Sequence, residues 1–452
     1  MMKNIWIISF DGVAISGIIT EALKLAAVLK EKGFHILLDL GYDIKTDKGN
    51  LGKPYEALRC YFPHWVELAR TADIRSLCDY NINFLNFVFR EVNSIGKINL
   101  IFSDLYKRIE KISDELSSNI CEYWNRENIS YIVVENGTLP ENVIFTKALY
   151  KAINIYGREL NLGKFVIWRD HDLMWSSETA VQKYGNAPYH NAVKPVLSPF
   201  IQYVTLHDAA AWKLKQWAGA DIDLSVLPNT YNFKYCENSG FVRPMLKIKS
   251  TDVVLTRPTR IIPQKRIDRD IHLVSHLRQR FATQGRETYL LVVGDTNENK
   301  HCTAALKLLA DQLGLTKNIL FLGGLPFILE KHNNHELSVQ TIILASDAVS
   351  FLTSYDYDSY GNPIGEAISL AKCYLTTRYE YYDAVYGDQG YLAPVMEITK
   401  YQDGLPDETF IDDVYELLNS PEKMQAYAKF NHQLGQKYLS DQVLHKFCNF
   451  FK

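Results

Sequence analysis

The stretch Ser354-Tyr-Asp-Tyr-Asp-Ser-Tyr-Gly-Asn-Pro-Ile-Gly-Glu-Ala367 decides the fold of the second half of this sequence. It follows an apolar run, 348–352, and leads into a helical pattern over 363–371, which predicts a turn from a buried strand into a helix. The turn places Asp358 and Glu366 around the helix N-terminus, with seven residues between them. Free amides and carboxylates at one turn suit a ligand that is anionic and rich in hydroxyl groups.

The residues of this turn also favour close approach of a ligand. Gly361 has no side chain, and Pro363 fits the first helical turn because its missing N–H would be unpaired there anyway. Glu366, one turn into the helix, could accept hydrogen bonds from ribose hydroxyls. Alternatively, it merely complements the helix dipole.

A second strand-to-helix unit upstream carries positive charge. Arg260-Ile-Ile-Pro-Gln-Lys265 follows the apolar run 253–255. With Pro263 between them, Arg260 and Lys265 would be held at the carboxyl end of a strand. There they could neutralise a diphosphate and stabilise it as a leaving group. The alternative interpretation is a surface pair that forms ordinary ion bridges.

Length and composition indicate two ordinary globular domains. The 452 residues exceed a typical single domain, and 47% are hydrophobic and 22% charged. A formal net charge of −3 provides no electrostatic basis for nucleic-acid binding. The seven cysteines form no Cys-x-x-Cys pair, which favours a reducing compartment over a disulfide framework or a zinc site.

The hydrophobic runs of the sequence are short. The first one, 5–10, is too short for a signal-peptide core, and no run approaches the roughly 20 apolar residues of a membrane span. We therefore expect a cytoplasmic protein and leave peripheral membrane association open.

Apolar runs alternate with helical patterns in both halves, which is typical of parallel βαβ units. The predicted elements of the first half are strands at 5–10, 34–40, 131–135, 165–169, 200–206 and 225–227 and helices at 18–32 and 142–156. Those of the second half are strands at 252–256, 288–293, 319–322, 347–352 and 374–377 with helices between them, and then two helical segments at 410–418 and within 422–451. The segment 45–93 fits neither pattern.

This alternation predicts an α/β protein of two Rossmann-like, doubly wound domains that face a cleft, with ligands at the carboxyl ends of the strands. The region 236–249 has no clear period, and we interpret it as the linker. We expect an N-terminal domain over 1–240 and a C-terminal domain over 241–431. The helix over 432–452 would pack back on the first domain.

Two motifs of the first half lie at strand ends. Trp168-Arg-Asp-His-Asp172 follows a predicted strand, and His171 could bind a sugar hydroxyl there, with a neighbouring carboxylate orienting its ring. The alternative is a structural histidine. The loop 11–17 joins the first strand to the first helix, so Gly17 could allow close approach of donor or acceptor near the helix N-terminus.

Several common catalytic motifs do not occur. The sequence has no Gly-x-Gly-x-x-Gly, no P-loop and no Gly-x-Ser-x-Gly, so dehydrogenase, nucleotidase and hydrolase interpretations lose their main support. Asp356-Tyr-Asp358 spells Asp-x-Asp, a metal and nucleotide-diphosphate signature in another architecture. The same short spelling recurs at 170–172 and 221–223, so we interpret it as a coincidence.

Several motifs of the chain resemble, in the same order, those of retaining GT-B glycosyltransferases of family 4. They are Leu227-Pro-Asn229, Arg260-x4-Lys265, Gly294-Asp295, Phe321-Leu-Gly-Gly324 and Asp358-x7-Glu366. Within that family the chain resembles mannosylglucosylglycerate synthases. This second likeness rests on Arg257-Pro-Thr-Arg260, on His171-Asp172 before Trp175, and on Tyr360-Gly-Asn362.

The resemblance implies carbohydrate biosynthesis by a GT-B enzyme that moves a hexose, with retention, from a nucleoside-diphosphate sugar to a hydroxyl of a small polar molecule or glycan. It implies that 1–240 is the acceptor domain and that 241–431 is the donor, or sugar-nucleotide, domain. It implies neither a protein nucleophile nor a required metal or other cofactor. The expected catalytic residues are Arg260 and Lys265 at the diphosphate and Asp358 and His171 at the transferred sugar. The other expected donor-binding residues are Gly17, Gly294, Gly361, Asn362, Pro363, Ile364 and, at the ribose, Glu366.

One departure from the family pattern affects the expected function. Asp358 stands where the family has glutamate, one methylene longer, and Ser359 stands where glycine is usual. The change could alter sugar preference or reduce activity, which motivates a second hypothesis, a sugar-nucleotide-binding GT-B protein without transfer activity. A third is a sugar-nucleotide epimerase, which would need an acid/base pair beside the sugar.

Overall fold

The computed structural model of the protein describes residues 3–10, 17–40, 59, 62–70, 82–92, 104–139, 142–173, 193–233, 239–325 and 336–451. The chain divides into two compact units. Unit 1 comprises Met1–Pro228 and Leu444–Lys452, and unit 2 comprises Asn229–Val443. The expected domain limits, at 240 and 431, stay predictions about which segments fold independently.

Unit 1 is built around one parallel sheet. Its strands are β1 (Asn4–Ser9), β2 (His35–Asp39), β3 (Val66–Leu68), β4 (Ile129–Glu135), β5 (Val166–Asp170), β6 (Ile201–Thr205) and β7 (Leu224–Val226). They lie in the order β3-β2-β1-β4-β5-β6-β7, so the order reverses between β1 and β4. Every residue of β5 and β6 is buried, as expected for central strands of a sheet covered on both faces.

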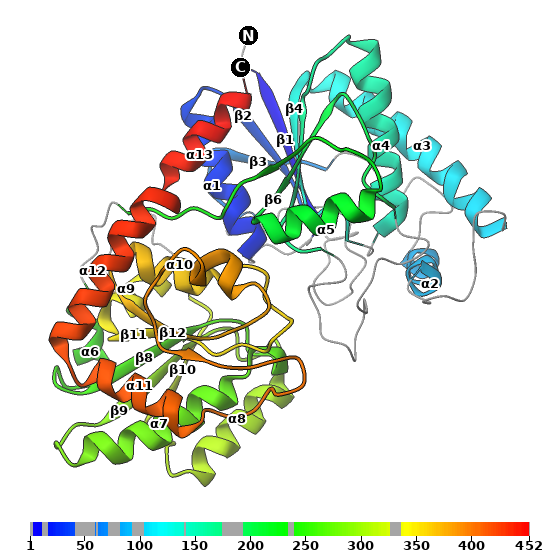
Figure 1. Ribbon diagram of the computed structural model, residues 1–452. Helices are drawn as coiled ribbons and strands as arrows, with labels where there is room; N and C mark the ends of the chain where they lie inside the picture. Colours follow the sequence, from blue (N-terminus) through cyan, green and yellow to red (C-terminus); the bar gives the residue numbers. More distant parts are fainter. Residues whose placement is uncertain are drawn as a thin grey trace. The chain divides into compact units, whose positions relative to one another are not determined.

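Helices cover both faces of this sheet. They are α1 (Gly17–Glu31), α2 (Ile82–Val92), α3 (Asp104–Arg126), α4 (Val143–Glu159), α5 (Asp208–Ala218), α13 (Asp441–Phe447), which begins in unit 2, and the 3-10 turn η7 (Cys448–Phe450). Figure 1 shows α1 and α13 on one face and α3 and α4 on the other. On the second face the rings of Trp6 and Tyr156 pack edge-on against Trp124 at 5.6 and 5.4 Å.

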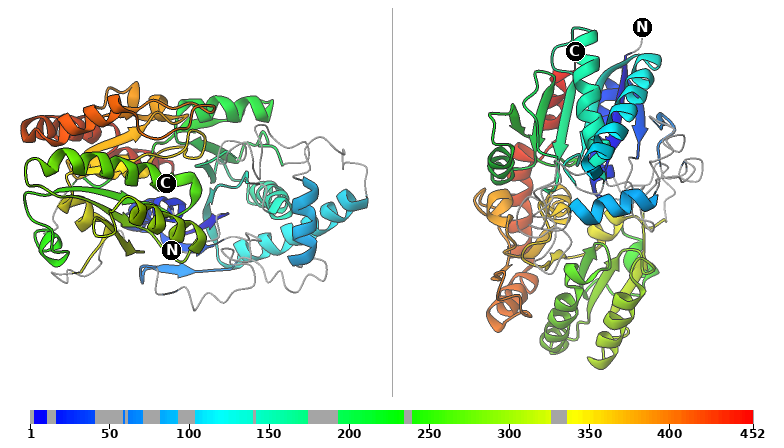
Figure 2. Two further views of the ribbon diagram at one scale, coloured as in Figure 1. Left: turned by 90° about the horizontal axis from the view of Figure 1, so that it is seen from below. Right: turned by 90° about the vertical axis from the view of Figure 1, so that its right-hand side faces the viewer.

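The C-terminal residues pack on the face of the unit 1 sheet that α1 and α13 cover. The ring of Phe451 lies 5.2 Å from that of Tyr131 on β4 and 6.4 Å from that of Phe34. Lys32 donates a hydrogen bond to Asn449 at 3.1 Å. Both ends of the chain therefore lie at the same side of unit 1 (Figures 1 and 2).

Unit 2 repeats the design with a second parallel sheet. Its strands are β8 (Val253–Pro258), β9 (Thr288–Val293), β10 (Ile319–Gly323), β11 (Ala348–Phe351), β12 (Cys373–Thr377) and β13 (Val395–Met396). They lie in the order β10-β9-β8-β11-β12-β13, so the order reverses between β8 and β11. Such a reversal is the switch point at which doubly wound proteins bind ligands, outside the carboxyl ends of the strands.

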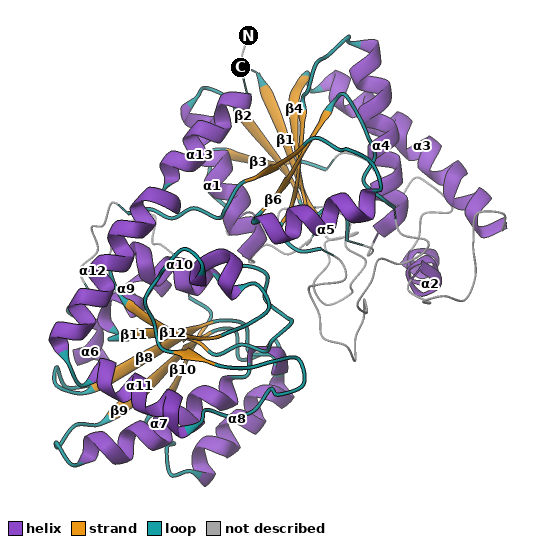
Figure 3. Cartoon of the chain, in the orientation of Figure 1, coloured by secondary structure: helices purple, strands orange, loops and turns teal. Residues whose placement is uncertain are grey.

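The helices of unit 2 cover both faces of its sheet (Figure 3). They are α6 (Val242–Met245), α7 (Ile267–Ala282), α8 (Lys300–Gln312), α9 (Val339–Ala345), α10 (Asn362–Ser369), α11 (Glu408–Leu418) and α12 (Pro421–Tyr438), with the 3-10 turn η5 (Pro263–Lys265) and the π-helix η6 (Asp383–Gly387). Buried residues of α7, α8 and α11 share a core with one face of the strands, and residues of α6 and α9 share a smaller core with the other.

The predicted strands are confirmed within two residues at either end. Several elements had no predicted counterpart, among them α2, α3, α5, β3 and β13. The predicted linker is wrong in part, because α6 lies within it and belongs to unit 2. Arg243 of α6 donates to the carbonyl of Ala345 at 2.7 Å and pairs with Asp347 at 3.0 Å.

Two further sequence expectations concern whole-chain properties. No helix in the described ranges is long and apolar enough to cross a bilayer. The cysteines that the structure describes, Cys121, Cys302, Cys373 and Cys448, are free thiols.

Replacing Gly137 by alanine should destabilise unit 1. A Cβ atom at Gly137, just after β4, would lie 2.2 Å from the fully buried ring of Trp168, so overpacking should cost about 1–3 kcal/mol. Thermal unfolding of Gly137→Ala should show a lower Tm than the wild type. Gly163→Ala is the matched control because nothing lies within 4 Å of its Cβ position. Equal Tm values for the two variants would contradict this packing constraint.

Candidate functional site

The candidate site of unit 2 is built from the two loops that flank its switch point. The loop 259–265 follows β8 and ends in η5, and the loop 352–361 follows β11 and enters α10. Because β8 and β11 are parallel neighbours, both loops leave the same edge of the sheet. The topology therefore brings together the two motifs that the sequence placed far apart.

Lys265 and Asp358 form the centre of this site. The Lys265 ammonium donates to Oδ1 of Asp358, and the hydroxyl of Thr353 donates to Oδ2. The two charged side chains are only 11% and 14% exposed. Burial lowers the pKa of Lys265, although Asp358 acts in the opposite direction. Lys265 is thus a desolvated cation with one carboxylate partner, which strengthens any contact it makes with an anion.

Arg260 lies close to this pair but is more open to solvent. Its guanidinium pairs with Glu298 and donates to the Tyr357 hydroxyl at 3.3 Å, and its side chain is 45% exposed. Its charge is near enough to contribute to the lowered pKa of Lys265, after burial as the main cause. Both cations thus form ion pairs within unit 2, which agrees with the interpretation of the motif as ordinary ion bridges. Both also lie at one switch point, which the interpretation as a diphosphate site requires.

The entry to α10 holds several of the predicted donor-binding residues. Gly361 is the N-cap in a left-handed conformation, with φ of +82°, and a Cβ there would lie 2.7 Å from the Tyr379 hydroxyl. Asn362 Oδ1 accepts hydrogen bonds from Asn229 at 2.7 Å and from the Tyr231 hydroxyl at 2.9 Å. The side-chain oxygen of Asn362 is therefore used within the protein, which leaves its side-chain NH2 and its backbone N–H as the groups to offer a ligand.

The other predicted site residues of unit 2 differ from one another in their surroundings. Pro363 occupies the first turn of α10, and Ile364 is fully buried. Glu366 is half-buried one turn further on. Gly294, in contrast, has a packing role, because a Cβ at this position would lie 2.1 Å from the carbonyl oxygen of Thr259. A side chain there would displace the loop that carries Arg260.

In unit 1, His171 is held by residues at the carboxyl ends of β4 and β5. Its Nε2 lies 2.8 Å from Glu135, which also accepts two hydrogen bonds from Arg169 at 2.8 and 2.9 Å. Burial would raise the pKa of Glu135, but Arg169 and His171 outweigh it and lower the pKa. A carboxylate does hold the ring, that of Glu135 on the neighbouring strand β4.

Asp170, next to His171, is a buried carboxyl group with an unusual environment. It is 1% exposed, and its Oδ1 accepts a hydrogen bond from the Thr138 hydroxyl at 2.9 Å. Its Oδ2 is buried, and no described residue donates a hydrogen bond to it. Burial raises the pKa of Asp170 to about 7.

Gly17 is the first residue of α1 and is exposed. The rest of its loop, 11–16, lies outside the described residues. So does Trp175, on which part of the family resemblance rests.

Sequence reasoning missed several residues that shape the site. Glu135 ends a predicted strand, so the rule that selected His171 could have selected it as well. Thr353, Asn229 and Tyr231 gave no usable signal, because their partners lie elsewhere in the sequence and the contacts depend on the folded loops.

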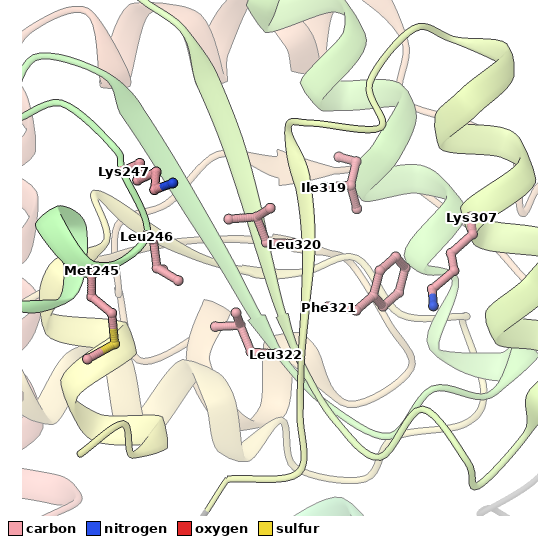
Figure 4. A pocket seen from close by; sticks show the side chains of 8 residues that line it. All are labelled: Met245, Leu246, Lys247, Lys307, Ile319, Leu320, Phe321 and Leu322. Carbon is pink, nitrogen blue, oxygen red and sulfur yellow. The ribbon is translucent and has the colours of Figure 1, made fainter.

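A pocket of unit 2 lies outside this site. Figure 4 shows it beside the edge strand β10, with Phe321 toward Lys307 and Leu320 and Leu322 toward Leu246. Its lining consists of Met245, Leu246, Lys247, Lys307, Ile319, Leu320, Phe321 and Leu322. None of the predicted site residues lines it.

Solved glycosyltransferases share the fold of this chain. A glycosyltransferase from Rickettsia africae is similar over 99% of this chain and 97% of its own, with a TM-score of 0.61 and 11% identity. The sucrose-phosphate synthase of Thermosynechococcus elongatus gives 0.60 at 10% identity over 99% and 98% of the chains. HepE from Anabaena, in complex with UDP and glucose, gives 0.59 at 11% identity over 99% and 98%.

No family model matches the sequence, and no curated protein matches it either. The two units, with parallel sheets of seven and six strands between helices, have the GT-B fold. The fold class predicted from the sequence is therefore confirmed. At this level of identity the likeness concerns the fold alone.

Asp170 should make the stability of unit 1 depend on pH. Because its pKa is about 7 when folded and 3.8 ordinarily, the folded protein keeps a proton that the unfolded chain loses as the pH rises above 4. This contribution to the free energy of unfolding, roughly 4 kcal/mol at most, is therefore complete below pH 4 and is lost as the pH rises to about 7. Thermal unfolding of the wild type between pH 4.5 and 7.5 should show this decline, and Asp170→Asn should flatten it.

The matched control for this pH dependence is Asp221→Asn. Its carboxylate is 96% exposed, so the variant should follow the wild-type profile. If Asp170→Asn followed it too, Asp170 would not be the titrating group.

Proposed function

We propose that the protein is a retaining glycosyltransferase of family 4 that transfers a hexose from a nucleoside-diphosphate sugar to a hydroxyl acceptor, a small polar molecule or a glycan. The observation that carries this proposal is the arrangement at the switch point of unit 2. There the desolvated Lys265, with Arg260 near it, and the N-terminus of α10 lie on loops that leave neighbouring strands. Cations and helix amides at one sheet edge are suited to a diphosphate.

The solved structures support the choice of donor. HepE has been crystallised with UDP and glucose and with UDP-glucose, and another structure of the same fold is a UDP-forming trehalose-phosphate synthase. UDP-glucose is therefore the first donor to test. The closer likeness to mannosylglucosylglycerate synthases belongs to the same proposal and makes GDP-mannose the second.

In the proposed reaction the bond between the sugar C1 and the diphosphate oxygen breaks, and a bond from C1 to the acceptor oxygen forms on the same face. The departing diphosphate oxygen accepts the proton of the acceptor hydroxyl, so no protein nucleophile takes part. Arg260 and Lys265, rather than a metal ion, neutralise the charge that develops on the diphosphate. Each could stabilise the transition state by about 3 kcal/mol, the scale of a lost oxyanion donor.

Asp358 has two tasks in this proposal. Each of its carboxylate oxygens already accepts a hydrogen bond, from Lys265 and from Thr353, so it acts as the counter-ion of Lys265. A sugar hydroxyl can use the remaining lone pairs. His171, fixed by Glu135, and Gly17 are assigned to the donor from unit 1 by the family resemblance, and Glu366 to the ribose. A cytoplasmic location completes the proposal.

A donor screen tests the proposed function directly. UDP-, GDP- and ADP-sugars should be compared for thermal stabilisation of the full chain, and one class should raise the Tm. With that donor and a mixture of hydroxylated acceptors, free nucleoside diphosphate and a glycoside of retained configuration should appear. Binding without turnover would point to a sugar-nucleotide-binding protein, and an epimeric sugar nucleotide as product would point to an epimerase. Binding of no sugar nucleotide would refute all three functions.

Lys265→Ala should reduce kcat/KM about 100-fold or more, since it removes a buried cation from the developing charge. Arg260→Ala should have a smaller effect, because its guanidinium is more exposed. The matched control is Lys372→Ala. Lys372 is a half-buried lysine whose pKa, like that of Lys265, is lowered by burial, but it precedes β12 at the amino end of the sheet. Full activity of both site variants would show that the phosphate assignment is wrong.

A further inference from the structure

We propose that Tyr379 and Tyr386 are positioning residues for donor binding, which act through the backbone at the entry to α10. This inference rests on the proposed function, since it concerns how the nucleoside diphosphate is held. Neither tyrosine belongs to the motifs that carry the family resemblance.

The two hydroxyls hold consecutive carbonyl groups. The Tyr379 hydroxyl donates to the carbonyl of Tyr360 at 2.7 Å, and the Tyr386 hydroxyl donates to the carbonyl of Gly361 at 3.2 Å. These carbonyls belong to the peptide groups whose N–H groups are those of Gly361 and Asn362. A peptide group is planar, so fixing its oxygen also fixes the direction of its N–H.

The hydrogen bonds also make these amides better donors. A hydrogen bond to a carbonyl oxygen polarises the whole peptide group and strengthens the next bond in the chain. Among the described residues, none accepts a hydrogen bond from the amide of Gly361 or of Asn362. The next residue is a proline, without an N–H, so these are the two amides that the start of α10 presents beside Lys265 and Asp358.

The surroundings of the tyrosines are rigid. Both side chains are at most 1% exposed, and Tyr379 packs edge-on against Phe351 at 5.6 Å. Gly361 is matched to Tyr379, since any Cβ would approach the hydroxyl to 2.7 Å. Tyr386 lies in η6, a π-helical turn, and such turns occur frequently at functional sites.

Three further tyrosines, Tyr360, Tyr231 and Tyr391, contact α10 or the residues that surround it. The Tyr360 hydroxyl donates to the carbonyl of Asn229 at 3.3 Å, and the Tyr231 ring packs where Gly365 has no side chain. The ring of Tyr391 lies 5.7 Å from that of Tyr386, but its buried hydroxyl forms no hydrogen bond with another residue in the described ranges. Tyr391 thus packs against these tyrosines, but its hydroxyl forms no hydrogen bond with the described backbone at the start of α10.

The test compares Tyr379→Phe and Tyr386→Phe with Tyr391→Phe as the matched control. Each full-length variant is titrated calorimetrically with UDP, or with the diphosphate of the donor found active, and its Tm is measured. Each of the first two should bind about 10-fold more weakly, the effect of one lost hydrogen bond. The KM for the donor should rise while kcat stays near the wild-type value. Tyr391→Phe should bind as the wild type does.

Two outcomes would overturn the inference. Either Tyr379→Phe and Tyr386→Phe bind the diphosphate as tightly as the wild type, or Tyr391→Phe loses as much affinity as they do, which indicates general packing. Failure of the wild type itself to bind any nucleoside diphosphate would instead refute the proposed function.

A second measurement covers the case in which a phenylalanine variant folds poorly. Hydrogen exchange of the segment 357–370 in the wild type should slow when the diphosphate is added, because the amides at the start of α10 become bonded. No slowing in a wild type that binds the diphosphate would show that these amides are not used.

Discussion

The geometry of the candidate site depends on one buried guanidinium, that of Arg257. It is fully buried and donates to the carbonyl of Lys265 at 2.7 Å and to that of Ser350 at 2.9 Å, and it faces Asp270 at 3.6 Å. A buried charge is tolerable only when it is paired and hydrogen-bonded, so these contacts constrain one another. Arg257 thereby ties the loop after β8 to β11 and α7. The ammonium of Lys265 can reach Asp358 because the guanidinium of Arg257 holds the Lys265 backbone in place.

The same principle, a side chain that holds the backbone of a candidate site loop, recurs in the described parts of both units. Tyr379 and Tyr386 hold the entry to α10, and Asn136 Oδ1 accepts a hydrogen bond from the backbone N–H of His171 at 2.6 Å. The groups that could contact a ligand are thus distinct from the side chains that place them, and the latter are deeply buried. This division suits a site for an anionic ligand, where the protein must orient donors before the charge arrives.

Much of the fold was predictable because buried parallel strands appear in a sequence as short apolar runs. The strand β3, Val66-Glu67-Leu68, has a charged residue at its centre and forms no apolar run; it pairs with β2 at the edge of the sheet. The positions of the site residues followed from the rule that ligands bind at strand ends. Their contacts did not, because the pairing of Glu135 with Arg169 requires the register between β4 and β5. The Lys265–Asp358 pair likewise requires β8 and β11 to be neighbours.

The path of the chain through the two units has a consequence for biosynthesis. Unit 2 is formed by one continuous segment, whereas unit 1 needs residues 444–451, including Phe451 against Tyr131. A chain that emerges from the ribosome can therefore finish unit 2 while one face of the first sheet still lacks its aromatic cover. The parallel bridge between Tyr231 and Ser440 closes unit 2 where the chain enters and leaves it. The unit that begins to fold first is thus the last to be completed.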